Sequence, residues 1–422
     1  MAGFLLLVVF LFPLFLFGGE RGRVPPSVAE YLYQTAVRYK ERANYIGALE
    51  ILRFLGNYKN ATTLYGEIAN FFKPIPVERI KGEPLVRVKL TSFERMTLVC
   101  PSEVYRFEVS RKGEEVEILL NGERMETFPT IGGENCRLYT NRRFMGFIPK
   151  GGNLSVKLLR GEAVAILNLP LEEYLRGVLP AEVYPSWHIE ALKAQAVASR
   201  TYALFNIYRA REAGKPFDVD ASTNFQAFTL RRRGYPRIDA AVEKTRGEVL
   251  TYNGSLIYAM FNSNNGGCSH SFEEITGIKL PYLSPVRTPV DISNLKWSRW
   301  KRQLPVERVE NFLSRMGLDW KVSSLRVARN KCGRGLLVIV QSMGGESLTL
   351  PLAVFFRLEM HLPSDWFYLK GREGNAFLLD GRGFGHGLGM SQWGAYRLAN
   401  DGWNYRRILK LYYKGTQIEK VY

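Results

Sequence analysis

Apolar residues recur along this chain with two different spacings, and each spacing predicts a different kind of element. From residue 25 to residue 72 they follow helical spacing through positions such as Leu49 and Leu52, and Gly56 interrupts the pattern. These residues therefore predict a small α-helical hairpin region. Prolines and charged residues fill positions 73–84, which predicts a linker.

Beyond the linker, short β-branched or alternating runs separated by Gly and Asn predict strands. The clearest runs are 85–90, 105–109, 114–120, 153–159, 162–169, 325–329 and 335–340. A helix is expected at about 187–210 and a helix-turn-helix at 394–413. This order favours an α+β fold over regular βαβ repetition, with one β-rich domain over 85–422 built around a long central helix.

The first 19 residues form an apolar run without a charged side chain. A run of this kind at the N-terminus is typical of an export signal or a membrane anchor, and it has no amphipathic face with which to pack as a core helix. Whether it is cleaved stays open. We therefore expect an exported protein of the cell envelope, attached to the membrane through this segment or secreted across it.

The net charge of +18 would attract any polyanion. Because an exported chain meets no genomic DNA, we expect the anionic envelope and not nucleic acid as the partner. The four cysteines are too few for a disulfide scaffold in 422 residues, and their pairing stays open among three connectivities. Cys268 and His270 could seed a zinc site, but two ligands are not four, so no cofactor is predicted.

Residues 167–209 contain the strongest candidate for chemistry. Glu182 lies between Ala181 and Val183 on an expected strand-to-helix corner, with Trp187 close by. Apolar and aromatic surroundings raise the pKa of a carboxyl toward the value that a general acid needs, whereas a nearby helix N-terminus would lower it. The sequence leaves this contest open, together with the alternative that Glu182 caps a helix or forms a salt bridge.

Residues 381–403 begin with five glycines in nine positions, which let the backbone approach a ligand or another loop closely. His386 lies among them and could donate to an oxyanion or a sugar hydroxyl, or bond a backbone carbonyl and so pin the loop. A third segment, 257–289, is an Asn, Ser and Gly loop suited to hydrogen-bonding a sugar. There is no GxSxG elbow for serine catalysis, and Cys268 with His386 is permitted but not required.

Together and in their order along the chain, several segments resemble the stage II sporulation protein D family. They are LEEYLRGVLPAEVYPSWHIEALKAQAVASRTYAL, FNSNNGGCSHS with PYL, GRGFGHGLGMSQWGA and LYYKGT. That family includes lytic transglycosylases and proteins named amidase enhancers. The resemblance runs from about residue 85 to the C-terminus. It implies that Glu182, in the segment LPAEVYP, is the catalytic residue. The loop FNSNNGGCSHS departs from the more serine-rich loop common in the family, and some members bind zinc near it, which keeps Cys268 and His270 as possible ligands.

The resemblance also implies a groove for peptidoglycan glycan strands, preferably strands without stem peptides. The residues expected to shape it lie on the helix after Glu182 and in the two loops: Lys193, Gln195, Arg200, Ser263, His386, Ser391 and Gln392.

A single carboxyl suffices for lytic transglycosylation, since the hydroxyl that attacks belongs to the muramic acid itself. Two other functions stay open. The chain could be a non-catalytic wall-binding protein that activates a cell-wall amidase, or a hydrolase that depends on Cys268. Residues 25–72 could dock such an amidase or another envelope protein, or serve only as a spacer, and pieces of them resemble tetratricopeptide-type helical pairs.

Overall fold

The computed structural model describes residues 24–422, except 113–114, 126–129, 134, 223–224, 231–233 and 289–296. The apolar segment 1–19, predicted to be a signal or anchor, lies outside the described residues. Within the described part of the chain, no helix combines the length and the apolar character that crossing a membrane requires.

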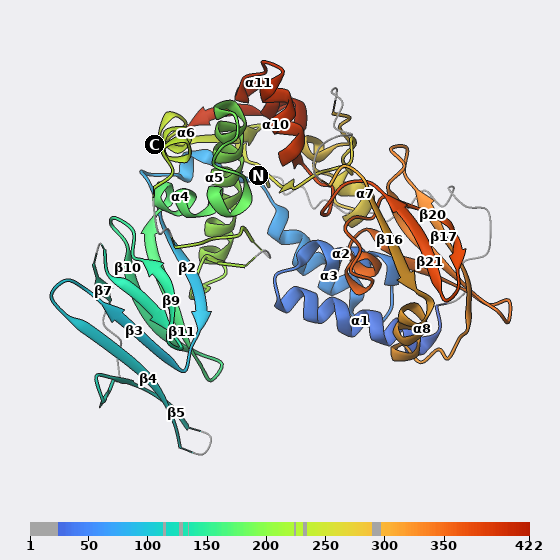
Figure 1. Cartoon of the computed structure of the whole chain (residues 1–422), viewed down its shortest axis with the longest axis horizontal. Helices are drawn as coiled ribbons and strands as arrows, with labels where there is room; N and C mark the ends of the chain where they lie inside the picture. Colours follow the sequence, from blue (N-terminus) through green and yellow to red (C-terminus); the bar gives the residue numbers. More distant parts are fainter. Residues whose placement is uncertain are drawn as a thin grey trace, which may run out of the picture.

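Helices and antiparallel sheets are mixed in this chain, which confirms the α+β prediction (Figure 1). A six-stranded sheet has the order β6 (Glu123–Arg124), β5 (Glu115–Leu120), β4 (Val104–Lys112), β3 (Arg95–Val99), β8 (Arg137–Thr140), β9 (Arg143–Phe147). A five-stranded sheet has the order β12 (Val219–Asp220), β2 (Leu85–Ser92), β11 (Glu162–Pro170), β10 (Asn153–Leu159), β7 (Ile131–Gly132). These two sheets form the lower left of the molecule in Figure 1.

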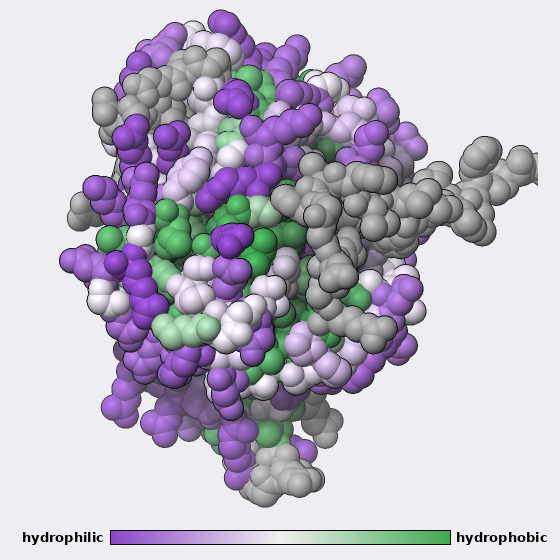
Figure 2. Space-filling model, turned by 90° about the vertical axis from the view of Figure 1, so that its right-hand side faces the viewer, coloured by the Kyte–Doolittle hydropathy of each residue, from purple (hydrophilic) through white to green (hydrophobic). Residues whose placement is uncertain are grey.

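The remaining strands form smaller sheets. Two three-stranded antiparallel sheets are β16 (Trp300–Pro305), β21 (Ala376–Gly381), β20 (Phe367–Glu373) and β17 (Val322–Arg329), β18 (Gly335–Ser342), β19 (Ser347–Pro351). A four-stranded sheet contains β1 (Ile75–Pro76), β14 (Ser255–Leu256), β13 (Glu248–Tyr252) and β23 (Gln417–Lys420), and β15 (Phe261–Asn262) pairs in parallel with β22 (Met390–Ser391). Figure 2 faces the side of the molecule that carries β17, β20 and β21, where apolar residues gather in the middle of a largely hydrophilic surface.

A long buried helix, α5 (Ile189–Glu212), forms the centre of the upper part of the molecule. Around it pack α4 (Leu171–Glu182), α6 (Pro236–Lys244), α10 (Gln392–Asn400), α11 (Tyr405–Tyr412) and strand β13. Residues on nearly every side of this helix are buried. Its many alanines allow this, because small side chains let several neighbours approach at once.

The N-terminal helices α1 (Pro26–Glu41), α2 (Tyr45–Leu55) and α3 (Ala61–Ala69) lie on the same side of the molecule as α7 (Phe272–Thr276) and α8 (Val306–Arg315) (Figure 1). Helix α2 contacts α7 and also residues 352–356, which lead directly into α9 (Arg357–Glu359). Buried Glu50 accepts backbone N–H bonds from Val354 and Phe355, and the Tyr65 hydroxyl donates to the Thr276 carbonyl oxygen. These helices therefore pack against the rest of the protein through buried contacts. The prediction of a linker at positions 73–84 is also wrong, because this segment contains strand β1 and its Ile75 is buried.

Candidate functional site

Glu182 is the last residue of α4. The apolar side chains of this helix, including Leu171, Leu175 and Val178, are buried at helical spacing. Pro180 lies inside the helix near its C-terminal end, where it has no N–H for the usual helical hydrogen bond. The strand-to-helix corner predicted at Glu182 is therefore wrong: β11 passes directly into α4 at residue 170, and Glu182 lies on a helix-to-helix corner.

This correction changes the electrostatics of the Glu182 carboxyl. The C-terminal end of a helix carries the negative end of its dipole, so α4 disfavours the carboxylate. Burial raises the pKa of Glu182, while hydrogen bonds from the Ala227 N–H and the Gln392 side chain oppose the rise; the net result is a raised pKa. The Ala227 N–H donates to Oε1 at 2.8 Å, and the Gln392 amide donates to Oε2 at 3.1 Å. Among the residues that the structure describes, two neutral donors hold this carboxyl and none forms an ion pair with it.

A groove of about 290 Å³ opens beside this carboxyl. Its lining is mostly aromatic and apolar: Pro180, Ala181, Glu182, Val183, Tyr184, Pro185, Trp187, Ser263, Trp297, Gln392 and Trp393. A larger hollow of about 570 Å³ between α8 and α9 shares none of these residues and is lined mainly by charged side chains. Of these two hollows, the smaller groove is the candidate functional site, because it combines a carboxyl of raised pKa with an apolar, aromatic wall.

Two segments that are far apart in the sequence meet in the wall of the groove. The parallel pair β15 and β22 aligns Asn262 with Ser391, so the next residues, Ser263 and Gln392, continue side by side into the groove. The Trp393 N–H donates to the Ser263 carbonyl oxygen at 3.0 Å and fixes this junction. Ser391 itself is fully buried, and its hydroxyl caps α10 by accepting from the Gly394 N–H. Ser263 and Gln392 therefore reach the groove, whereas Ser391 supports it.

The glycine-rich segment packs tightly behind this wall. A side chain at Gly389 would collide with the backbone of Met260, and one at Gly387 would collide with the Arg334 guanidinium. The Leu388 N–H donates to Nδ1 of His386 at 3.1 Å, so Nε2 carries the proton and donates to the Phe261 carbonyl oxygen at 3.1 Å. Both ring nitrogens are thus occupied by the backbone, which agrees with the loop-pinning alternative.

The electrostatic surroundings of His386 point the same way. Burial, assisted by the charges of Arg357 and Arg334, lowers the pKa of His386 to about 3. The imidazole is therefore neutral at physiological pH and cannot act as a cationic donor to a substrate.

The three residues predicted on α5 do not line the groove. Lys193 forms an ion pair with Glu190 at 2.6 Å and lies over the Tyr405 ring. Gln195 is buried and donates to the Ser199 hydroxyl.

Arg200 is fully buried in a two-bond pair with Glu172, at 2.9 and 2.7 Å. It has no surface with which to contact a substrate, so the structure corrects its predicted binding role to a structural one. The Glu172 carboxylate compensates its charge inside the core.

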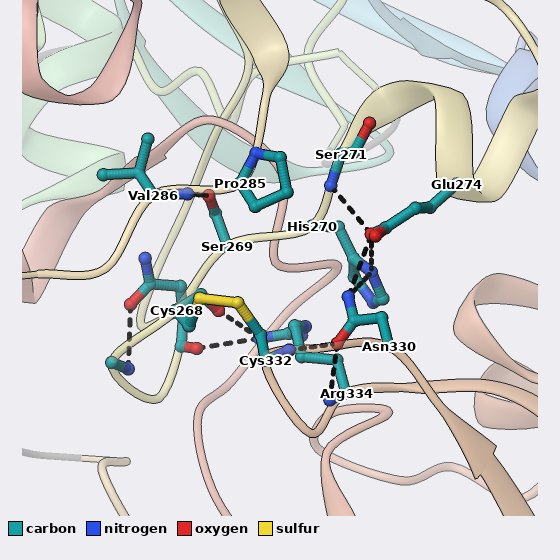
Figure 3. The surroundings of a disulfide bond; sticks show 12 residues. Cys268, Ser269, His270, Ser271, Glu274, Pro285, Val286, Asn330, Cys332 and Arg334 are labelled. Atoms are coloured by element: carbon teal, nitrogen blue, oxygen red, sulfur yellow. Dashed lines mark hydrogen bonds and ion pairs between the residues drawn. A yellow bond between two sulfur atoms is a disulfide. The ribbon is translucent and has the colours of Figure 1, made fainter.

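The polar loop is tied to the β17–β18 hairpin by a disulfide between Cys268 and Cys332 (Figure 3). Cys268 is therefore neither a thiolate ligand nor a free nucleophile in this form, contrary to the zinc and cysteine-hydrolase possibilities. His270 is buried and pairs through Nε2 with Asp365 at 2.6 Å.

The second disulfide joins Cys100 to Cys136. Disulfides persist in oxidising compartments, which agrees with a protein that acts outside the cytosol.

Sequence reasoning did not find three contributors to the site. The Ala227 N–H is a backbone group of a loop, and a backbone donor leaves no signal in the side-chain pattern. Trp297 and Trp393 line the groove, and no motif pointed to Trp297. For Trp393, its position directly after Gln392 was the available signal.

Comparison with known proteins places Glu182 inside a matched region. Residues 160–252 match the family model SpoIID, described as Stage II sporulation protein. The chain is 33% identical to stage II sporulation protein D of Bacillus subtilis over 285 residues, which cover 64% of this chain and 81% of that protein. It is 35% identical to an uncharacterized protein of Brachyspira hyodysenteriae over 258 residues, covering 60% of this chain and 68% of the relative. An amidase enhancer of Bacillus subtilis is 28% identical over 296 residues, 58% of this chain and 40% of that protein.

Proposed function

Because this chain belongs to the stage II sporulation protein D family, we propose that it cuts peptidoglycan glycan strands by lytic transglycosylation. The observation that carries the proposal is the Glu182 carboxyl, whose pKa is raised by burial at the edge of an aromatic groove. A raised pKa keeps a larger fraction of this group protonated near neutral pH, as the first chemical step requires.

The number of carboxyls in the groove favours transglycosylation over hydrolysis. Among the residues described along its lining, Glu182 is the only acidic one. Glycosidases that hydrolyse usually employ two carboxyls, one of which activates water or attacks the sugar. In transglycosylation the C6 hydroxyl of the muramic acid is tethered to the reacting ring, and no second group is needed to activate water.

Glu182 first donates its proton to the glycosidic oxygen, the bond from C1 to that oxygen breaks, and the departing sugar leaves with a hydroxyl. The developing carboxylate is stabilised by the N–H groups of Ala227 and Gln392, which already point at its two oxygens. The C6 hydroxyl then attacks C1 and gives its proton to Glu182. This closes a 1,6-anhydro ring and restores the acid without consuming water.

The test is to incubate amidase-treated sacculi with the wild-type protein and with Glu182→Gln, and to analyse the products by mass spectrometry. We expect anhydromuramic ends from the wild type and none from the variant. Ordinary reducing ends from the wild type would refute the mechanism.

A second function is favoured by the similarity to an amidase enhancer and by the net charge of +18, which suits an anionic wall. In that case the protein would bind glycan and stimulate an amidase without cutting glycan itself. Equal stimulation by the wild type and Glu182→Gln, with no glycan fragments from either, would favour this function.

A further inference from the structure

Two separate parts of the chain contribute aromatic side chains to the groove beside Glu182. The first is the corner between α4 and α5 together with α10, where the rings of Trp187 and Trp393 lie 4.9 Å apart and Tyr184 lies 6.0 Å from Trp393. The second is Trp297, whose ring lies 4.6 Å from that of Phe384 at an angle of 34°. Trp297 lines the groove, so Phe384 continues the same aromatic surface beyond it.

The backbone holds Phe384 firmly at the rim of the groove. Phe384 and Asn264 exchange both backbone hydrogen bonds, at 2.7 and 3.1 Å, one residue from the groove-lining Ser263. Its neighbours Gly383 and Gly385 have φ angles of +80° and +106°, a conformation that suits glycine. A side chain at Gly383 would also come within 2.6 Å of the Asn264 carbonyl oxygen. The position of Phe384 is therefore built into the loop.

This fixed ring is 39% exposed although it carries no polar atom. Keeping an apolar ring in water costs free energy, and a rigid, exposed aromatic ring beside a polar cleft is typical of a binding surface. A pyranose ring matches it, because its axial C–H groups form an apolar face while its hydroxyls point sideways toward groups such as Ser263 and the backbone of the loop.

We propose that Trp297 and Phe384 form a sugar-stacking subsite that extends the Glu182 groove past Ser263. It holds a ring of the glycan strand other than the two that flank the cleaved bond. This inference rests on the proposed function, since it assumes that a glycan strand occupies the groove. The subsite contributes to affinity and to the choice of longer strands, not to the proton transfers.

The experiment measures binding of amidase-treated, solubilised glycan strands by calorimetry in a Glu182→Gln background, where no cleavage can alter the ligand. Covering the exposed part of one ring removes tens of Å² of apolar surface from water, so Phe384→Ala should weaken binding by about tenfold. Phe384→Trp should restore it, because stacking needs a flat ring and not phenylalanine itself.

The matched control is Leu358→Ala, which removes an apolar side chain that is also 39% exposed but lies in α9, outside the groove. It should leave glycan binding unchanged. In active protein, Phe384→Ala should raise KM on long strands and leave kcat nearly unchanged. Undiminished glycan binding by Phe384→Ala would overturn the subsite. Failure of the proposed function gives a different result: wild-type protein that binds glycan but releases no anhydro ends.

Discussion

Replacing Arg200 by methionine separates a structural role from a substrate-binding role most sharply. The Arg200 guanidinium is fully buried, donates twice to Glu172, and donates at 3.0 Å to the Glu248 carbonyl oxygen. Methionine fills similar volume without charge, so the variant leaves the Glu172 carboxylate buried without its partner. The loss of a partner from a buried ion pair costs about 3–5 kcal/mol of unfolding free energy.

The pH dependence of this loss has a defined sign. Burial raises the pKa of Glu172, but the hydrogen bonds and charge of Arg200, with help from Tyr422 and Gly247, bring it below its ordinary value. In the wild type this pair stabilises the fold above the ordinary pKa of a glutamate, and the contribution is lost as pH falls through the lowered value. In Arg200→Met, the hydrogen bonds from Tyr422 and Gly247 remain, but burial loses its main opponent and raises the pKa of Glu172. The defect should therefore be largest at neutral pH and shrink as the carboxyl becomes protonated.

The assay is urea unfolding followed by circular dichroism at neutral and mildly acidic pH. The double variant Glu172→Gln with Arg200→Met should recover most of the lost stability, because no buried charge remains. As a matched control, Arg406→Met breaks a half-exposed pair with Glu248 and should cost less than about 1 kcal/mol. Unchanged stability of Arg200→Met together with weakened glycan binding would refute the structural assignment.

Three other contacts described above lead to further predictions. Gln392→Ala removes a donor to the Glu182 carboxylate, so the pKa of Glu182 should rise and the alkaline limb of the kcat/KM profile should move up by about one pH unit; a downward shift would contradict the assignment. Cys332→Ser opens a disulfide that spans 64 positions, and thermal or urea unfolding should show a loss of about 4 kcal/mol, whereas an unchanged midpoint would argue against the bond. Burial raises the pKa of Glu50 to about 7, so its cost to folding appears as pH rises from about 4.5 to 7; Glu50→Gln should remove about 3 kcal/mol of this pH dependence, and an unaltered slope would contradict its burial.

Local patterns were enough to predict the elements that later carry the site. The helix at 187–210 matches α5, and the pair at 394–413 matches α10 and α11. Glu182, Ser263 and Gln392 were all candidates in the sequence, and all three line one groove. The chain order of motifs identified them, but only the parallel pairing of β15 with β22 explains why two of them lie side by side.

The sequence did not reveal which residues far apart in the chain contact one another in the fold. Arg200 looks like an exposed cation on a helix, because nothing in its local spacing reveals Glu172, 28 positions earlier, as a buried partner. The corner at Glu182 was misplaced because the local pattern did not reveal that α4 continues through Pro180 to Glu182, since proline usually interrupts a helix interior. The cysteine pairing likewise depends on the tertiary fold.

In the proposed mechanism, Glu182 moves a proton twice while the sugar's own hydroxyl attacks, so that solvent contributes no atom to the product. Cleavage of amidase-treated glycan in water labelled with heavy oxygen tests this directly. We expect anhydromuramic ends that carry no label, and no such ends from Glu182→Gln. New reducing ends in place of anhydro ends, formed by the wild-type protein and absent with Glu182→Gln, would show that water is the nucleophile and would refute the proposed mechanism.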